Sequence, residues 1–260
     1  MQDIIRQELR RLEAEFEIKI IYAVESGSRA WGFASIDSDW DVRFIYVHRP
    51  EWYLSIDDKK DSLVQILPND IDLGGWEIRK ALKLFNKSNP PLMEWLRSPI
   101  VYVENGGFVN SLRDLSKDYF NPKNCLHHYL HMAEGNFKEY LQKDMVRTKK
   151  YFYVLRPILA CQWIESKNSM PPMEFDLTFK EFITDPILKI EIETLLSRKK
   201  SGEELNEEPK IEVINNYLNE RIIHFQELVK SFPASKSTGN LLLNNLFRKT
   251  LKESWYNGSS

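Results

Sequence analysis

The 260-residue sequence has only two cysteines, Cys125 and Cys161, and no Cys-x-x-Cys arrangement. Each lies in an apolar stretch that predicts a helix, so we expect two buried free thiols in a reducing compartment. No run approaches the ~18 uninterrupted apolar residues that a membrane-spanning helix needs. The N-terminus alternates charged and apolar residues, unlike a secretory signal. We therefore expect a cytoplasmic protein without a membrane partner.

Neither sign of charge is in excess, because 36 Lys and Arg residues face 38 Asp and Glu residues, for a formal net charge of −2. This balance excludes a nucleic-acid binder that relies on overall positive charge, although local basic patches remain open. The chain also lacks the G-x-x-x-x-G-K-[ST] phosphate loop, so any phosphate site must be built differently. With 42% hydrophobic residues, the chain can form one large domain or two smaller ones.

The first part of the chain has the pattern of an α/β domain. Apolar residues at helical spacing predict a helix over 2–15, and short β-branched runs predict strands over 19–24 and 40–47. The other expected elements are strands over 62–67 and 70–76, a short helix over 29–33 and a helix over 77–87. The segment 88–104, with an apolar helical middle, closes this domain.

Strand patterns nearly vanish after residue 105, and amphipathic helices replace them. We expect helices over 124–142, 146–165, 179–197, 211–231 and 239–253. The charged segment 197–210 predicts an exposed loop. The chain is therefore expected to divide into an α/β domain over 1–110 and a helical domain over 111–260.

The motif GSRAWGFASIDSDWDV, which begins at Gly27, indicates a function. On a strand, Asp39 and Asp41 point to the same side, with Trp40 opposite. Two adjacent carboxylates repel each other unless a cation lies between them, and Mg²⁺ prefers carboxylate oxygens combined with substrate phosphates. Gly27 and Ser28 end one strand where the Asp pair begins the next. The motif thus predicts a site for a polyphosphate and its metal ions, and the alternative is an ordinary turn followed by a capping Asp.

A helix that starts near Ser28 would direct its free N–H groups at the phosphates. Arg29 could add a bidentate contact to the same phosphates. Gly27, Ser28 and Arg29 are therefore our candidates for nucleotide binding in the first domain.

These residues resemble a known family. The runs GSRAWGF, SDWDVRF and DLGGWEIRKALKLFNKSNPPLMEWLRSPIVY are similar to the polymerase-beta-like nucleotidyltransferase superfamily, and within it to the RNA-ligase-associated branch. The resemblance is strong over about 20–105 and looser up to 149–164. It implies an α/β (α+β) fold, in which a nucleotidyltransferase domain with a short mixed sheet is followed by an all-α domain.

The resemblance also implies a reaction. Asp39 and Asp41 would bind two Mg²⁺ ions, and a nucleoside monophosphate would pass from an NTP to an acceptor hydroxyl. The superfamily has a third carboxylate on a later strand, for which Asp72 is our candidate because it precedes the glycines and tryptophan of the branch. Asp70, two residues earlier, is the alternative. The branch suggests an RNA end as the acceptor.

The helix expected over 146–165 places Lys149, Tyr153 and Arg156 on one face, and Lys150 flanks them. A cationic and aromatic stripe suits a triphosphate and a stacked base, and the resemblance implies a helical domain that closes over the nucleotide. We therefore expect Lys149, Lys150 and Tyr153 to contact the NTP. The alternative is a solvated basic face.

Two other functions fit the same motifs. The acceptor could be a protein side chain or a small molecule instead of RNA. The chain could also be a nucleotide-binding sensor that keeps the fold without turnover, which is expected if neither Asp70 nor Asp72 reaches the metal site. No motif indicates which NTP is used.

Overall fold

The computed structural model describes residues 1–203, 205–232 and 238–256. These residues form two compact units, each of which is built from separate stretches of the chain. Unit 1 contains residues 1–30, 39–119 and 238–256, and unit 2 contains residues 31–38 and 120–232.

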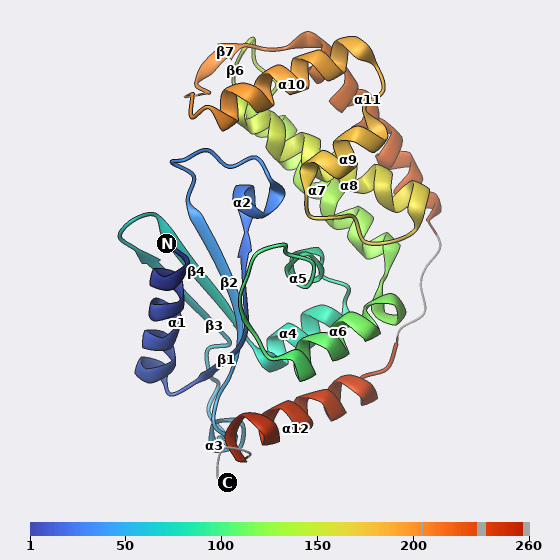
Figure 1. The fold of residues 1–260 in the computed structure, drawn as a ribbon. Helices are drawn as coiled ribbons and strands as arrows, with labels where there is room; N and C mark the ends of the chain where they lie inside the picture. Colours follow the sequence, from blue (N-terminus) through green and yellow to red (C-terminus); the bar gives the residue numbers. More distant parts are fainter. Residues whose placement is uncertain (204, 233–237, 257–260) are drawn as a thin grey trace. The chain divides into compact units, whose positions relative to one another are not determined.

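Unit 1 is built around a mixed five-stranded sheet in the order β3-β4-β2-β1-β5 (Figure 1). β2 and β4 are parallel, whereas the β1–β2, β1–β5 and β3–β4 pairs are antiparallel. The strands are β1 (Lys19–Ser26), β2 (Trp40–Val47), β3 (Ser62–Leu67), β4 (Ile71–Glu77) and β5 (Val101–Glu104).

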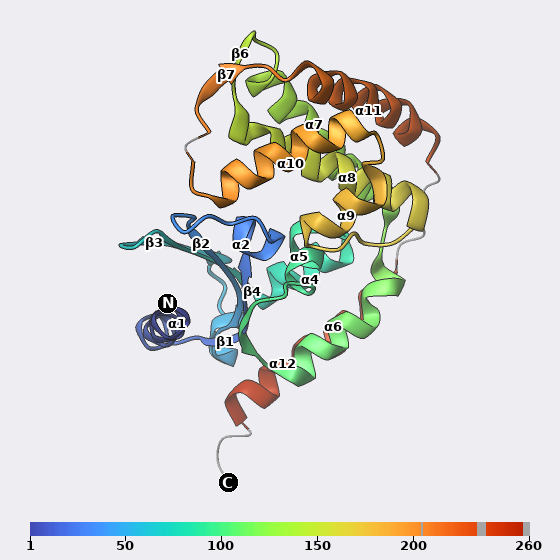
Figure 2. The same ribbon diagram turned by 45° about the horizontal axis from the view of Figure 1, so that its top comes forward.

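Helices cover both faces of this sheet (Figures 1 and 2). The helix α1 (Gln2–Phe16) packs its buried Ile5, Leu9 and Leu12 on one face, against apolar side chains of β1, β2 and β4. On the other face lie α4 (Ile78–Asn86), α5 (Pro90–Trp95) and α6 (Gly106–Tyr119), and α12 (Leu241–Tyr256) packs on α4 and α6. Two short helices, α2 (Gly27–Trp31) and α3 (Pro50–Tyr53), follow β1 and β2.

Unit 2 is helical apart from a small ribbon. The long helices α7 (Pro122–Tyr140), α8 (Tyr151–Lys167) and α11 (Glu212–Ser231) pack on one another, α9 (Phe175–Phe182) packs on α8, and α10 (Pro186–Lys200) packs on α11. The short strands β6 (Met145–Arg147) and β7 (Glu207–Pro209) are antiparallel, and the 3₁₀ turn η1 (Thr148–Lys150) leads into α8.

The α/β class and the mixed sheet expected from the sequence are confirmed. Each of the four expected strands is present, and β2 and β3 have the expected bounds. The segment after α5 adds β5, a short strand that was not expected. Its pairing with β1 is a contact across more than 70 residues of chain, which local patterns do not reveal.

The single helix expected over 179–197 is wrong. α9 ends at Phe182 and a new helix, α10, begins at Pro186. The Asp185 side chain accepts a hydrogen bond from the Leu188 N–H, and Pro186 stands at the first helical position, where it lacks only a donor that the helix does not need. The expected loop over 197–210 is partly wrong, because α10 continues to Lys200 and Glu207–Pro209 form β7.

The compact units do not follow one division point of the chain. The segment 31–38 belongs to unit 2, because Phe33 packs its ring on those of Phe152 and Phe175, with centroids 5.0 and 5.5 Å away. α12 belongs to unit 1, where Leu243 and Leu246 are buried. Among the described residues, no helix is long and apolar enough to cross a membrane.

Candidate active site

Asp41 and Asp72 lie opposite each other on the parallel strands β2 and β4. Asp41 also pairs with Ser26, the last residue of β1, so Gly27 and Ser28 follow directly beside it. The sheet order therefore brings together three separate stretches of the chain: the Gly-Ser pair, Asp41 of β2 and Asp72, the first acid of β4. Side chains of Asp41 and Asp72 are 30% and 37% exposed, so solvent and ligands can reach both carboxylates.

Gly27 and Asp41 are in close contact. Gly27 has a φ of +63°, and a Cβ at this position would lie 2.0 Å from Oδ2 of Asp41. The backbone conformation favours glycine, and the space that a side chain would take is occupied by the carboxylate. Gly27 is thus required here by both its conformation and the close approach of Asp41.

A buried glutamate fixes the backbone of Asp41 from the other side. Glu25 is fully buried, and its Oε1 accepts a hydrogen bond from the Asp41 N–H at 2.8 Å, while its Oε2 accepts one from the Tyr102 hydroxyl. Burial raises the pKa of Glu25 to about 7, although the hydrogen bonds from Tyr102 and Asp41 lower it. Glu25 therefore holds the Asp41 backbone in place without reaching the surface.

Arg43 bridges the two carboxylates. Its Nη2 lies 3.1 Å from Oδ1 of Asp41 and 2.8 Å from Oδ2 of Asp72. Burial raises the pKa of Asp41 above its ordinary value, the charges of Asp72 and Asp39 raise it further, and Arg43 lowers it. The site is thus a cluster of negative charge that one guanidinium partly neutralises.

The other acids of the motif occupy different positions. Asp39 precedes β2 and is exposed, and its carbonyl oxygen accepts a hydrogen bond from Nε of Arg29. The Arg29 guanidinium lies over the Trp40 ring, 3.7 Å from its centroid. Asp70 has a φ of 57° in the turn before β4, and its carbonyl accepts a hydrogen bond from the Trp40 N–H. Of the two candidates for the third carboxylate, Asp72 is the one beside Asp41.

The donor set suits a hard divalent cation. Among the described residues, no group of three His, Cys, Asp or Glu side chains is arranged to hold a metal ion. Mg²⁺, however, commonly binds one or two carboxylates and completes its coordination with substrate phosphates and water. Asp41 and Asp72 converge on one cation already, the Arg43 guanidinium, which shows that their oxygens can share a positive group. The residues present therefore fit Mg²⁺ held jointly with a phosphate ligand.

The candidates in the helical region lie in unit 2. Lys149 and Tyr153 are exposed, and Nζ of Lys150 lies 4.1 Å from the ring centroid of Tyr140 and 4.7 Å from that of Tyr153. Arg156 stacks on Trp31, with 4.4 Å from its Cζ to the ring centroid. The helix expected over 146–165 is wrong at its start, because Met145–Arg147 form β6, Thr148–Lys150 form η1 and α8 begins only at Tyr151, so Lys149 and Lys150 precede the helix. Within α8, Phe152, Leu155 and Leu159 are buried, as expected. Unit 2 thus carries a surface cluster of aromatic rings and cations.

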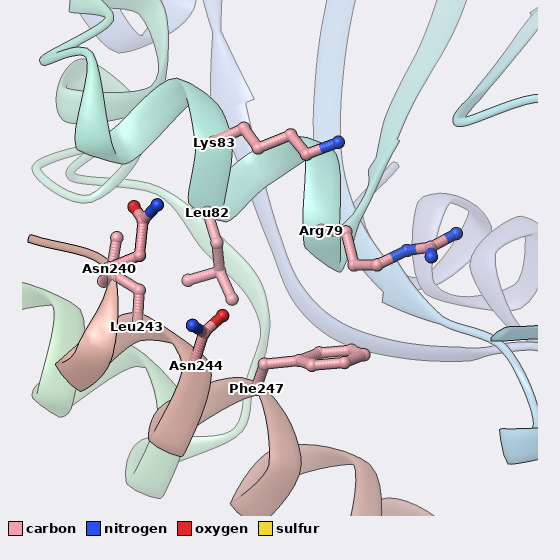
Figure 3. Close-up of a pocket in the computed structure, with 7 residues that line it drawn as sticks. All are labelled: Arg79, Leu82, Lys83, Asn240, Leu243, Asn244 and Phe247. Carbon is pink, nitrogen blue, oxygen red and sulfur yellow. The ribbon is translucent and has the colours of Figure 1, made fainter.

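A pocket of about 210 Å³ lies in unit 1 between α4 and α12, and Figure 3 shows Leu82 pointing from α4 toward α12. The pocket lies beyond the end of β4, whereas Asp72 is at the start of that strand. It is therefore separate from the carboxylate cluster. Its lining residues are Arg79, Leu82, Lys83, Asn240, Leu243, Asn244 and Phe247.

Sequence reasoning missed Glu25 and Arg43. Arg43 stands two residues after Asp41, so the alternation of a strand places both side chains on one face, and this signal was available. Glu25 is the only acid in the apolar strand β1. A carboxylate at a position that the pattern marks as buried is unusual, and it indicates a polar partner in the fold.

Comparisons with known proteins show the family of this chain. A family model described as the RNA repair pathway DNA polymerase beta family, RlaP, matches residues 1–249. The uncharacterized protein YcgL of Bacillus subtilis (strain 168) is 49% identical over 260 residues, which is the full length of both chains. The crystal structure of a nucleotidyltransferase-like protein from Exiguobacterium sibiricum is 13% identical, with a TM-score of 0.32 over 96% of this chain and 80% of that one. Because the family model spans nearly the whole sequence, the chain belongs to the RNA repair pathway DNA polymerase beta family.

Proposed function

We propose that this protein is a cytoplasmic, Mg²⁺-dependent nucleotidyltransferase that moves a nucleoside monophosphate from an NTP to a hydroxyl at an RNA end. The observation that carries the proposal is the placement of Asp41 opposite Asp72 on parallel strands, directly beside Gly27 and Ser28. The chain belongs to the RNA repair pathway DNA polymerase beta family, and this membership supports both the proposed reaction type and RNA as the acceptor.

In this proposal, the acceptor oxygen forms a bond to the α-phosphorus of the NTP. The bond from that phosphorus to the bridging oxygen breaks, and pyrophosphate leaves with the electron pair. Asp72 is the candidate to accept the proton of the acceptor hydroxyl, because its carboxylate is exposed enough to meet a substrate. Ser28 and the backbone beside Gly27 would contact the phosphates, and Arg29 would add a positive charge.

Two Mg²⁺ ions would be held by Asp39, Asp41 and Asp72 together with the substrate phosphates. When bound, Mg²⁺ supplies charge neutralisation of the triphosphate and a lower pKa for the acceptor hydroxyl. The protein's part is to place the carboxylates: Gly27 leaves the space that the Asp41 carboxylate occupies, and Glu25 accepts a hydrogen bond from the Asp41 backbone N–H. Lys149, Lys150 and Tyr153 of unit 2 are proposed to contact the nucleotide.

The proposal is tested with the purified full chain, each α-³²P-labelled NTP, Mg²⁺ and a short RNA with a free hydroxyl at its end. We expect label in the RNA and release of pyrophosphate, with both lost in Asp41→Asn and Asp72→Asn. Asp70→Asn is the matched control, because Asn also tolerates the positive φ of that turn position, and it should keep transfer.

Other outcomes identify the alternatives. Label on a protein side chain or on an added small molecule would replace RNA as the acceptor. NTP binding without release of pyrophosphate would contradict an enzyme and favour a nucleotide-binding sensor. Full activity of Asp72→Asn together with loss in Asp70→Asn would reverse the assignment of the third carboxylate.

A further inference from the structure

Arg43 occupies the position between Asp41 and Asp72 where a cation is needed. A single nitrogen, Nη2, is within 3.1 Å of an oxygen of each carboxylate. Two carboxylates that share one site repel each other unless positive charge lies between them. In the protein without metal, the guanidinium supplies that charge.

The backbone holds the guanidinium at this place. Its other terminal nitrogen, Nη1, donates to the carbonyl oxygens of Val42 at 3.1 Å and Asp72 at 3.0 Å. A Cβ at Gly74 would lie only 3.2 Å from Cδ and Nη1 of Arg43, so this glycine leaves room for the side chain. The Arg43 side chain is 23% exposed. Its position is therefore set by the sheet as well as by the two carboxylates.

A divalent cation and the Nη2 group make use of the same carboxylate oxygens. Cation affinity in carboxylate sites depends on the net charge of the ligands, and Arg43 removes one unit of negative charge from this cluster. We propose that Arg43 is an internal counter-ion that competes with the metal, so that it lowers the metal affinity of the free enzyme and keeps the two carboxylates together until metal binds. This inference rests on the proposed function, because it assigns Arg43 a part in the same metal site.

The experiment measures Mn²⁺ binding to the full chain, without nucleotide, from the electron paramagnetic resonance signal of the free ion. Arg43→Met removes the charge and keeps the length of the side chain. We expect this variant to bind Mn²⁺ about fivefold more tightly or better, the lower end of typical coupling between two interacting sites. Its melting temperature without metal should fall, and added Mn²⁺ should restore more of it than in the wild type.

Arg113→Met is the matched control. Arg113 also belongs to unit 1 and pairs with a carboxylate, that of Glu104 at 2.6 Å, but on α6 and away from the cluster. Arg113→Met removes the same charge from the chain as Arg43→Met does, but the Mn²⁺ affinity of the Arg113→Met variant should stay at the wild-type value. Tighter binding in both variants would attribute the effect to overall charge and would overturn the role of Arg43.

A second variant keeps the test decisive if Arg43→Met does not fold. Arg43→Lys keeps the charge but lacks the fork that spans two carbonyls and two carboxylates, so its Mn²⁺ affinity should lie above that of the wild type. Unchanged or weaker binding in a folded variant would overturn the inference, as would the absence of Mn²⁺ binding in all proteins. Metal-dependent transfer by the wild type would then leave the proposed function intact and reject only the counter-ion.

Discussion

Glu25→Gln tests how the buried glutamate behind the site contributes to stability. The carboxyl is fully buried, and burial raises its pKa from the ordinary 4.5 to about 7. At about 1.4 kcal/mol for each pH unit, this difference corresponds to about 3 kcal/mol. Glutamine keeps both contacts, because its oxygen can accept from the Asp41 N–H and its amide can donate to the Tyr102 hydroxyl.

The direction of the effect follows from proton binding. Below the unfolded pKa of about 4.5, the carboxyl is protonated in both states, and its contribution to stability is fully present. As the pH rises toward 7, the unfolded chain loses the proton first, so the free energy of unfolding of the wild type falls. Above the folded pKa of about 7 the loss is complete. The glutamine variant has no such group and should not show this loss.

The assay is urea unfolding of both proteins in EDTA, at a series of pH values between about 4.5 and 8. The stability of Glu25→Gln relative to the wild type should increase by about 3 kcal/mol across this range. Taking the difference at each pH cancels the other titrating groups, which the two proteins share. Glu104→Gln, in which the exchanged side chain pairs with Arg113 at the surface, measures the effect of losing any carboxylate. A difference that does not change with pH would refute an uncharged Glu25 in the folded protein.

Substitutions at Gly27 and Gly75, with Gly32 as a control, test the close packing at the site and in the sheet. Gly27→Ala should lose nucleotidyl transfer, because its Cβ would displace the Asp41 carboxylate. Gly32 also has a positive φ, +84°, but a Cβ there would meet no atom within 4 Å, so Gly32→Ala should keep transfer while backbone strain lowers its free energy of unfolding by about 1–2 kcal/mol. Equal activities of the two variants would contradict the contact between Gly27 and Asp41. Gly75→Ala should lower the free energy of unfolding by about 1–3 kcal/mol in a denaturant titration, because its Cβ would lie 2.2 Å from the Phe44 ring. A stability equal to that of the wild type would show that the ring moves aside at no cost.

Local patterns in the sequence predict much of unit 1. The strand Trp40–Val47 has the expected bounds because an apolar, β-branched run follows a turn that is rich in Ser and Asp. The strand Val101–Glu104 was missed because it is short and depends on pairing with β1. The break between α9 and α10 had a signal, the Asp185-Pro186 pair, which combines an N-cap residue with a proline at the first helical position.

Some residues of the candidate site could likewise be predicted from local patterns, and others could not. Asp39 and Asp41 stand out because their spacing of two residues can be read directly from the sequence, and Asp72 followed only from the family resemblance. Asp72, and not Asp70, lies opposite Asp41 because of the register between the parallel strands β2 and β4. Local patterns in the sequence do not reveal this register. The discontinuous units were also beyond local patterns, because the position of Phe33 depends on rings more than 100 residues away in the chain.

Three neighbours surround Asp41, and each acts on a different part of this residue. Gly27 leaves the space in which the carboxylate lies, Glu25 fixes the backbone N–H, and Arg43 balances the charge. A carboxylate fixed in advance does not need to reorganise when a ligand arrives, which is a condition for electrostatic stabilisation of a reaction. Glu25 can hold the Asp41 backbone without adding negative charge to the site only while its carboxyl is protonated. Arg43 can balance the charge of the carboxylates only while no stronger cation is present. The support of Asp41 is therefore expected to respond to both pH and metal concentration.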